Sequence, residues 1–294
     1  MELARRVFCG AAAALLLCTA GSAQTMRFET NVGNIDMVLN PTGDANLQPL
    51  VDNIVAYIGL GRYHYTAINR AADGGAGTAD DFVLQMGGFL GFQPLPDYWA
   101  ANRVAVEALE PVTVDSNGDG AVDFSSLTNA RGEVSLALRA GDPNSGTSSF
   151  FINLGNNAFL DSQGFVPFAR IENMDTVDGI LQLMQSDQSG GSGDLSVSDI
   201  PVLDNGRMVV VNRVTVLQSD PGFSFVGPIA TALELASRNS ASSSAASSSL
   251  LAAGSASSLG GGSIAVGAVP EPTTVALAGI AALGALALRR RVRG

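Results

Sequence analysis

The stretch RGEVSLALRAGDPNSGTSSFFIN, residues 131–153, holds two candidate strands, GEVSLALRAG (132–141) and SSFFIN (148–153). Each is a short run with an apolar centre, bounded by turn-forming or small polar residues, as strands commonly are. Further strand candidates of this kind lie at residues 81–92, 165–172 and 207–218. So many short strands predict an all-β barrel or sandwich.

The N-terminal part of the chain adds a hairpin and a helix. In MRFETNVGNIDMVLN (26–40), apolar residues alternate on either side of a Val-Gly-Asn turn, which is the pattern of a β-hairpin. QPLVDNIVAYIGLG (48–61) places its apolar residues on one helical face and closes with glycines. A second amphipathic helix is predicted to begin near Asn173.

Ser149 precedes two phenylalanines and raises the question of a nucleophile. A serine hydrolase needs a base and an oxyanion hole, and the sole histidine, His64, lies in the turn GRYHYT without a recognisable nucleophile elbow. We therefore expect His64 in a surface loop. One histidine and no cysteine in the mature chain also argue against a transition-metal site.

Composition narrows the class of protein. The 294 residues are 46% apolar, enough for one well-buried domain with additional segments. The formal net charge is −11 and all 16 basic residues are arginines, which argues against a nucleic-acid partner.

Residues 1–23 are predicted to be a signal peptide. Two arginines precede a short apolar core, and small residues precede a cleavage site near Ala23. Both cysteines lie in this segment, so the exported domain is expected to fold without disulfides. Lipid attachment at Cys18 is the less favoured alternative, because Leu17 stands where a small residue is usual.

The C-terminal part is a linker followed by a sorting segment. Residues 222–268 contain a Ser, Ala and Gly tract too poor in large apolar groups to fold. Residues 269–294 carry Pro-Glu-Pro, then about 16 apolar or small residues that would span about 24 Å as a helix, then an arginine cluster.

This last segment resembles the PEP-CTERM sorting signal of exopolysaccharide-producing Gram-negative bacteria. The resemblance implies a short transmembrane helix, transient inner-membrane anchoring and processing by an exosortase-type enzyme, and the arginines fit a cytoplasmic end. A permanent tail anchor is the alternative. The expected location is the periplasm, the outer surface or the extracellular matrix.

Residues 26–217 resemble a bacterial cyclophilin-type peptidyl-prolyl isomerase. The resemblance rests on the collinear segments RFETNVGNIDMVL, PLVDNIVAYIGLGRYHYTAINR, DFVLQMGG, RGEVSLALRAGDPNSGTSSFFIN, AFLD, FVPFARI and MDTVDGI. It implies that residues 24–221 form a closed eight-stranded antiparallel barrel capped by two α-helices, with the active site on its outer face. In this family the strand at 148–153 walls a proline pocket, so Ser149 has no catalytic role.

The implied chemistry is rotation about an X–Pro bond in proline-containing polypeptides. The barrier is about 18–20 kcal/mol because the C–N bond has partial double-bond character. Twisting leaves a lone pair on the prolyl nitrogen, and a fixed guanidinium then stabilises the twisted state more than the planar states. No cofactor or covalent intermediate is required.

The resemblance implies that Arg70 is the catalytic residue. It implies substrate-binding roles for Phe82, Val83, Gln85, Ala140, Phe151, Leu160 and Phe165. Without the collinear pattern, the phenylalanines would be interpreted as ordinary core and Arg70 as a surface residue.

Four features depart from the family. Asn69 stands where histidine is usual, Ser149 where glutamine is usual, and Phe165 where histidine or tyrosine is common. The glycine-rich connection AADGGAGTAD (71–80) is longer than the family's. These departures predict reduced activity or an altered substrate preference.

The insertion DSNGDGAVD (115–123) resembles the first half of a calcium loop. Asp115, Asn117 and Asp119 supply oxygen groups at the required spacing, and Gly120 follows. Ser126 occupies the twelfth position in place of the bidentate glutamate, so a weak calcium site and a plain acidic turn are both open interpretations.

Three functions compete. The first is an exported isomerase that assists the folding of exported or surface proteins. The second is a proline-peptide-binding module with weak or no isomerase activity, displayed at the cell surface or in the matrix, and the third is a structural barrel. Arg70 beside an apolar pocket favours the isomerase, because a structural barrel needs no cation there.

Overall fold

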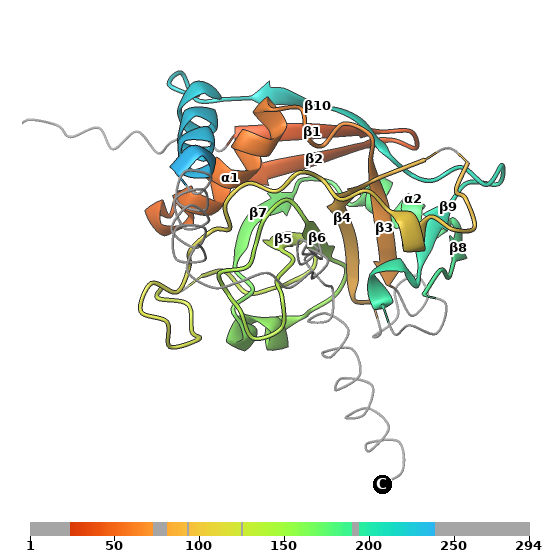
Figure 1. The fold of residues 1–294 in the computed structure, drawn as a ribbon, viewed down its shortest axis with the longest axis horizontal. Helices are drawn as coiled ribbons and strands as arrows, with labels where there is room; N and C mark the ends of the chain where they lie inside the picture. The colour runs from red at the N-terminus through yellow and green to blue at the C-terminus, as the bar shows by residue number, and fades with distance from the viewer. Residues whose placement is uncertain (1–23, 73–80, 93, 125, 190–193, 239–294) are drawn as a thin grey trace, which may run out of the picture.

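The computed structural model describes residues 24–72, 81–92, 94–124, 126–189 and 194–238 (Figure 1). The predicted signal peptide and sorting segment lie outside the described residues. The fold is dominated by one antiparallel sheet. Its eight strands lie in the order β10 (Val211–Gln218), β1 (Gln24–Thr30), β2 (Asn34–Leu39), β7 (Pro167–Ile171), β5 (Glu133–Leu136), β6 (Phe150–Asn153), β4 (Val83–Leu90) and β3 (Thr66–Ala72).

Helices and a small second sheet complete the described fold. The labelled elements are α1 (Gln48–Gly59), α2 (Asp175–Leu181), β8 (Met184–Ser186), β9 (Ile200–Val202) and the 3-10 turns η1 (Ala45–Leu47), η2 (Ala100–Asn102), η3 (Ala158–Gln163) and η4 (Leu195–Val197). Residues 226–238 are also helical. Both predicted helices are confirmed, as is the 26–40 hairpin, in which Phe28 pairs with Ile35.

The sheet is a curled, open half-barrel, so the predicted closed barrel is wrong. Its edge strands are β10 and β3, and the described residues join them by one isolated bridge, Ala67 to Val210. The sheet stays open because two different segments hydrogen-bond to the outer edge of β3. The N–H of Ile68 donates to Val209 O at 3.0 Å, whereas the N–H of Ala71 donates to Asp199 O at 2.8 Å.

The main core lies inside the curl of the sheet. Aromatic rings from three parts of the chain meet there: Phe28 packs against Tyr63 and Phe150 with ring centroids 5.7 and 5.6 Å apart. All three side chains are fully buried. The Phe28–Phe150 contact is edge-on and the Phe28–Tyr63 contact is tilted, and such contacts add to the free energy gained by burying the rings.

A second, smaller core packs on the other side of β3 and β4. It joins Ala67 and Phe89 to Trp99, Ile200 and Met208. Trp99 lies edge-on to Phe89 at 6.3 Å and donates its Nε1–H to Leu90 O at 3.1 Å. Segments 95–103 and 195–202 therefore cover the outside of the two strands with apolar contacts.

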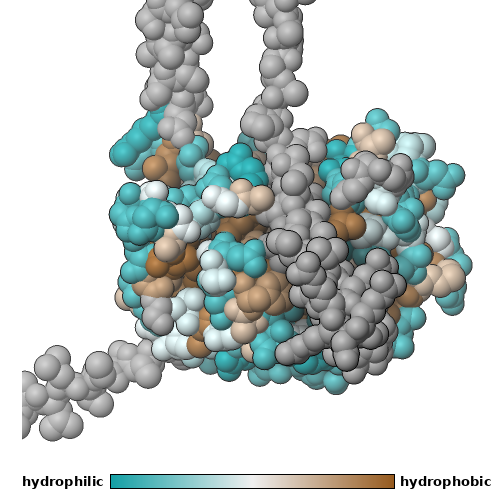
Figure 2. Space-filling view, turned by 90° about the horizontal axis from the view of Figure 1, so that it is seen from below, coloured by the Kyte–Doolittle hydropathy of each residue, from teal (hydrophilic) through white to brown (hydrophobic). Residues whose placement is uncertain are grey.

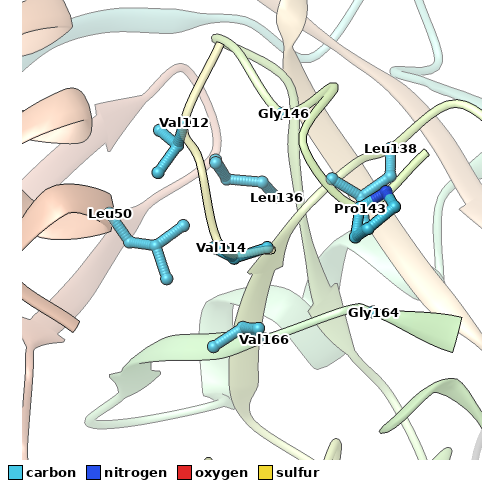
Figure 3. A pocket seen from close by; sticks show the side chains of 9 residues that line it. All are labelled: Leu50, Val112, Val114, Leu136, Leu138, Pro143, Gly146, Gly164 and Val166. Carbon is cyan, nitrogen blue, oxygen red and sulfur yellow. The ribbon is translucent and has the colours of Figure 1, made fainter. Parts of the chain in front are cut away.

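The base of the 115–123 insertion is built into the main core. Val112 and Val114 face Leu50 of α1 and Leu136 at the end of β5 across a cavity of about 10 Å³ (Figure 3). A space this small holds one water molecule at most. The insertion is thus anchored at its base by close apolar packing.

Residues 223–238 belong to the packed domain, although we predicted a linker from residue 222. The 226–238 helix lies beside α1 (Figure 1), and Phe223, Phe225 and Ala232 pack against the main core. A Cβ at Gly59 would come within 2.7 Å of Ile229. Gly59 therefore permits the close approach of this segment, which composition alone did not reveal.

The described surface mixes polar and apolar residues. On the face shown in Figure 2, apolar patches are interrupted by polar side chains. Among the described residues, no helix combines the length and apolar character that crossing a membrane requires. The predicted membrane-spanning segment at 269–294 is not among these residues.

The buried carboxylate of Glu133 on β5 generates a prediction about stability. Burial raises its pKa, and Arg170, whose Nε donates to it at 2.7 Å, opposes the shift. The raised pKa means that burial disfavours the charged carboxylate of Glu133. The neutral carboxyl group therefore adds to the free energy of unfolding at low pH, and this contribution is lost as the pH rises through the raised pKa. Arg170→Ala should therefore lower the free energy of unfolding by about 2 kcal/mol at pH 8, with a smaller loss at pH 4.

Urea denaturation at the two pH values measures this difference. The matched control is Arg213→Ala, which removes the exposed partner of Glu29 and should change stability little at either pH. Equal losses at pH 4 and pH 8 for Arg170→Ala would show that the Glu133 charge does not matter.

Candidate active site

Arg70 is oriented by an irregularity in β3. Along the β3–β4 ladder, Ile68 pairs with Met86 and Arg70 pairs with Gln85, so Asn69 is an extra residue without a cross-strand partner. Such a β-bulge reverses the normal alternation of side chains. Ile68 and Ala71 consequently both enter the main core, and Arg70 lies on the opposite face from Ala71.

The bulge is held by the segment that covers the edge of β3. Asn69 is fully buried and donates its Nδ2–H to Ser196 O at 2.9 Å. On the other side of Arg70, Gln185 donates to Ala71 O at 3.0 Å, and Ala71 N–H donates to Asp199 O. Both neighbours of Arg70 are therefore fixed by hydrogen bonds to Gln185, Ser196 and Asp199, which lie in residues 184–189 and 194–202, here called the covering segment.

Cross-strand pairing places three of the predicted site residues in one row. Arg70 of β3 pairs with Gln85 of β4, and Gln85 pairs with Phe151 of β6. Directly paired residues point to the same face of a sheet. The antiparallel order therefore brings Arg70, Gln85 and Phe151 together from distant parts of the sequence.

The guanidinium of Arg70 is buried and incompletely hydrogen-bonded. The residue is 3% exposed, and its Cζ lies 5.5 Å from the centroid of the Phe82 ring. Its Nε and Nη1 have no hydrogen-bond partner among the described residues. Burial lowers the pKa of Arg70, and the charges of Asp199 and Asp194 oppose that shift. Arg70 keeps its charge because guanidinium groups are not deprotonated in proteins.

An aromatic residue that sequence reasoning missed extends the site. Phe159 of η3 stacks on Phe82, with centroids 6.0 Å apart and an interplanar angle of 18°. It is 47% exposed, which is unusual for a phenylalanine. Its position beside Leu160 in the AFLD segment was the signal that could have identified it.

The remaining pocket residues form a buried apolar group beside this row. Phe151 and Phe165 meet edge-on at 5.6 Å, and Leu160 and Val83 are fully buried in the same core. Ala140 is different. It is exposed in the turn after β5, and no described ring contact, hydrogen bond or core cluster links its side chain to the others.

Ser149 is a hydrogen-bond acceptor for Gln85. The Nε2–H of Gln85 donates to Ser149 Oγ at 3.1 Å, while Gln85 Oε1 lacks a partner among the described residues. Ser149 thus orients the side chain of Gln85 by a direct hydrogen bond.

His64 is exposed, as predicted for a surface loop.

The predicted calcium ligands lie in a self-bonded loop. Asp115 accepts hydrogen bonds from the N–H groups of Gly118 and Gly120, and Asn117 accepts from Asp119 N–H. No group of three or more acidic, histidine or cysteine side chains suited to a metal occurs among the described residues. A calcium site here stays a prediction.

Comparisons with known proteins identify the family of the chain. The family described as cyclophilin type peptidyl-prolyl cis-trans isomerase/CLD matches residues 25–202, and the PEP-CTERM protein-sorting motif matches residues 268–291. The chain therefore belongs to the cyclophilin type peptidyl-prolyl cis-trans isomerase family. Its enzyme class, an isomerase of X–Pro bonds, follows from that membership.

Individual relatives carry the same description. Peptidyl-prolyl cis-trans isomerase cyp18 of Streptomyces antibioticus is 30% identical over 186 residues, which cover 60% of this chain and 95% of the relative. Peptidyl-prolyl cis-trans isomerase B of Escherichia coli is 30% identical over 197 residues, covering 64% and 97%. A crystal structure of a Cryptosporidium parvum cyclophilin type isomerase covers 68% of this chain and 99% of its own, with 17% identity and a TM-score of 0.45.

The buried contact of Asn69 gives a second prediction. Asn69→Leu removes the donor to Ser196 O and leaves that buried carbonyl unsatisfied, so the free energy of unfolding should fall by about 1–3 kcal/mol. Chemical denaturation measures the change. Asn212→Leu on β10, an exposed strand position, is the control and should be nearly neutral. A neutral Asn69→Leu would mean that the covering segment is held without this bond.

Proposed function

We propose that this chain is an exported peptidyl-prolyl isomerase in which Arg70 is the catalytic residue. The observation that carries the proposal is the buried guanidinium with two nitrogens lacking partners beside aromatic side chains. Leaving buried donors unsatisfied costs about 1–3 kcal/mol each. A bound peptide offers the acceptors that would satisfy them.

In the proposed mechanism, Arg70 stabilises the twisted peptide bond. The prolyl nitrogen acquires a lone pair as conjugation is lost, and a fixed guanidinium N–H can donate to it. Both planar ground states offer a weaker acceptor there, so the interaction favours the transition state. The bulge at Asn69 fixes the direction of the Arg70 guanidinium before substrate binds.

The proposed substrate site combines the row and the aromatic group. The buried side chains of Phe151, Leu160, Val83 and Phe165 would form the apolar wall behind the proline ring, and Gln85 would supply a polar contact with the peptide backbone. Phe82 and Phe159 extend this surface toward solvent. Ala140, which we also predicted to bind substrate, lies exposed in a separate turn.

We further propose that the enzyme acts on exported or surface proteins. The PEP-CTERM motif indicates export, and with the predicted signal peptide it supports sorting by an exosortase-type enzyme after transient anchoring in the inner membrane. Proline isomerisation takes tens to hundreds of seconds without catalysis and can limit folding. A catalyst displayed outside the cytoplasm would relieve that step for proteins folding there, and it needs no cofactor.

A second candidate function is peptide binding without useful turnover. The observation that favours it is the Gln85–Ser149 hydrogen bond, which occupies an amide N–H that could otherwise contact substrate. Peptide binding without catalysed exchange would select this alternative.

Replacement of the proposed catalytic residue gives the decisive prediction. Arg70→Ala should lower the catalysed cis–trans exchange of a proline tetrapeptide about 100-fold, and Arg70→Lys should also be strongly impaired because an ammonium lacks the planar fork. Exchange spectroscopy measures the rates. Arg139→Ala, which removes an exposed arginine paired with Asp142, is the control for charge loss. Wild-type rates in folded Arg70→Ala would refute the mechanism.

The exposed aromatic stack gives a further prediction. Phe159→Ala should lower kcat/KM about 3- to 10-fold, mainly by raising KM, because the peptide loses one aromatic face. Phe92→Ala, which truncates another phenylalanine of similar exposure (45%), should leave kcat/KM unchanged. An equal loss in both variants would show that Phe159 has no specific role in binding.

A further inference from the structure

A cavity of about 310 Å³ lies beside the proposed proline site. One wall is the inserted loop, with Val122, Phe124 and Leu127. The other wall is the end of η3 and the residues that follow it, with lining residues between Asp161 and Val166. The cavity is open to solvent at Ala121 and Ser162, which are exposed. Its volume is near the lower end for ligand pockets, roughly 300–1,000 Å³.

Phe165 is shared between this cavity and the group of residues proposed to bind proline. Its ring packs edge-on against Phe151, and it also lines the cavity. One extended residue spans about 3.3–3.6 Å, so a peptide bound at the proposed proline site can place a neighbouring side chain on the other side of Phe165 within one or two residues.

The inserted wall is held in place at its base. Asn144 Oδ1 accepts hydrogen bonds from the N–H groups of Val114 and Asp115 at 2.7 and 2.9 Å, and Asn144 Nδ2 donates to Asp115 O. Val112 and Val114 pack into the main core beneath it. The loop therefore faces the end of η3 and the residues after it from an anchored position.

The lining suits a side chain with an apolar stem and a cationic end. Val122, Phe124 and Leu127 offer apolar surface for the stem. Asp161 Oδ1 is fixed by hydrogen bonds from Asn129 N and Nδ2 at 2.9 and 2.8 Å, and its Oδ2 has no partner among the described residues. None of the residues lining the cavity is basic. Lysine and arginine match this combination, since they bury their stems and keep the charge at a polar rim.

We propose that this cavity is a substrate subsite that binds a lysine or arginine side chain close to the isomerised proline. The inference rests on the proposed function for its location, and it adds a substrate preference that the proline site alone does not give. The net charge of −11 would favour the approach of such basic segments.

A peptide series tests the subsite. Proline peptides carry lysine, glutamine or glutamate at each position from two before to two after the proline. Both kcat/KM and Kd are measured with the full chain. At one position we expect lysine to exceed glutamine about fivefold and glutamate to be the poorest. The calorimetric Kd series tests the same preference even if turnover is absent.

Three variants test whether the carboxylate of Asp161, and not the overall charge of the protein, causes the lysine preference. Asp161→Asn keeps an oxygen for the bonds from Asn129 and should bring the lysine-to-glutamine ratio close to one. Asp204→Asn makes the same charge change at an exposed turn position outside the cavity and should keep the ratio. Ser162→Arg, which places a cation at the exposed rim, should reverse the preference toward glutamate and needs no change at Asp161.

Each outcome bears on the subsite. The absence of a lysine preference at every position, its persistence in Asp161→Asn, or an equal loss in Asp204→Asn would overturn it. Turnover of all peptides without a preference would refute only the subsite, whereas binding with a lysine preference and no turnover would support the subsite and refute the proposed catalysis.

Discussion

The extra residue in β3 is the constraint on which the candidate site depends. A regular strand would place residue 70 on the same face as Ile68, inside the core, where a guanidinium could not remain without a large desolvation cost. The bulge at Asn69 shifts the alternation by one, so that Ile68 and Ala71 fill the core and Arg70 faces the aromatic side chains. The backbone irregularity therefore decides whether the guanidinium of Arg70 points into the core with Ile68 or lies beside Phe82, where we propose that substrate binds.

The covering segment, residues 184–189 and 194–202, explains why the bulge persists. An unpaired residue in an edge strand leaves backbone groups without ladder partners, and this segment supplies partners on both sides of Arg70 through Ser196, Asp199 and Gln185. The same segment prevents β10 from pairing along the whole of β3, which leaves the sheet open. The open edge and the orientation of Arg70 are thus two results of one arrangement.

Most strands of the main sheet and both helices could be predicted from the sequence, because apolar periodicity is a local signal. β3, β8 and β9 were not among the predicted strands. Arg70, Gln85 and Phe151 were identified only through the collinear resemblance to a known family, and their cross-strand alignment appeared only in the structure. The β-bulge could not be predicted, because nothing in the sequence around Asn69 indicates that this residue lacks a cross-strand partner. Phe159 was missed because exposure is a tertiary property, and the packing of residues 223–238 was missed because its key determinant is a glycine on another helix. Asn69 replaces the usual histidine, yet its buried amide has a structural partner that no sequence pattern encodes.

Trp99 is the only tryptophan in the chain, and it lies in the small cluster outside β3 and β4, far in sequence from the tyrosines of the main core. Its indole is buried, with its N–H bonded to Leu90 O. Intrinsic fluorescence excited at the indole band therefore reports on that outer cluster alone. The protein carries a built-in optical probe of the layer that braces the arginine-bearing strand, distinct from any signal of the central fold.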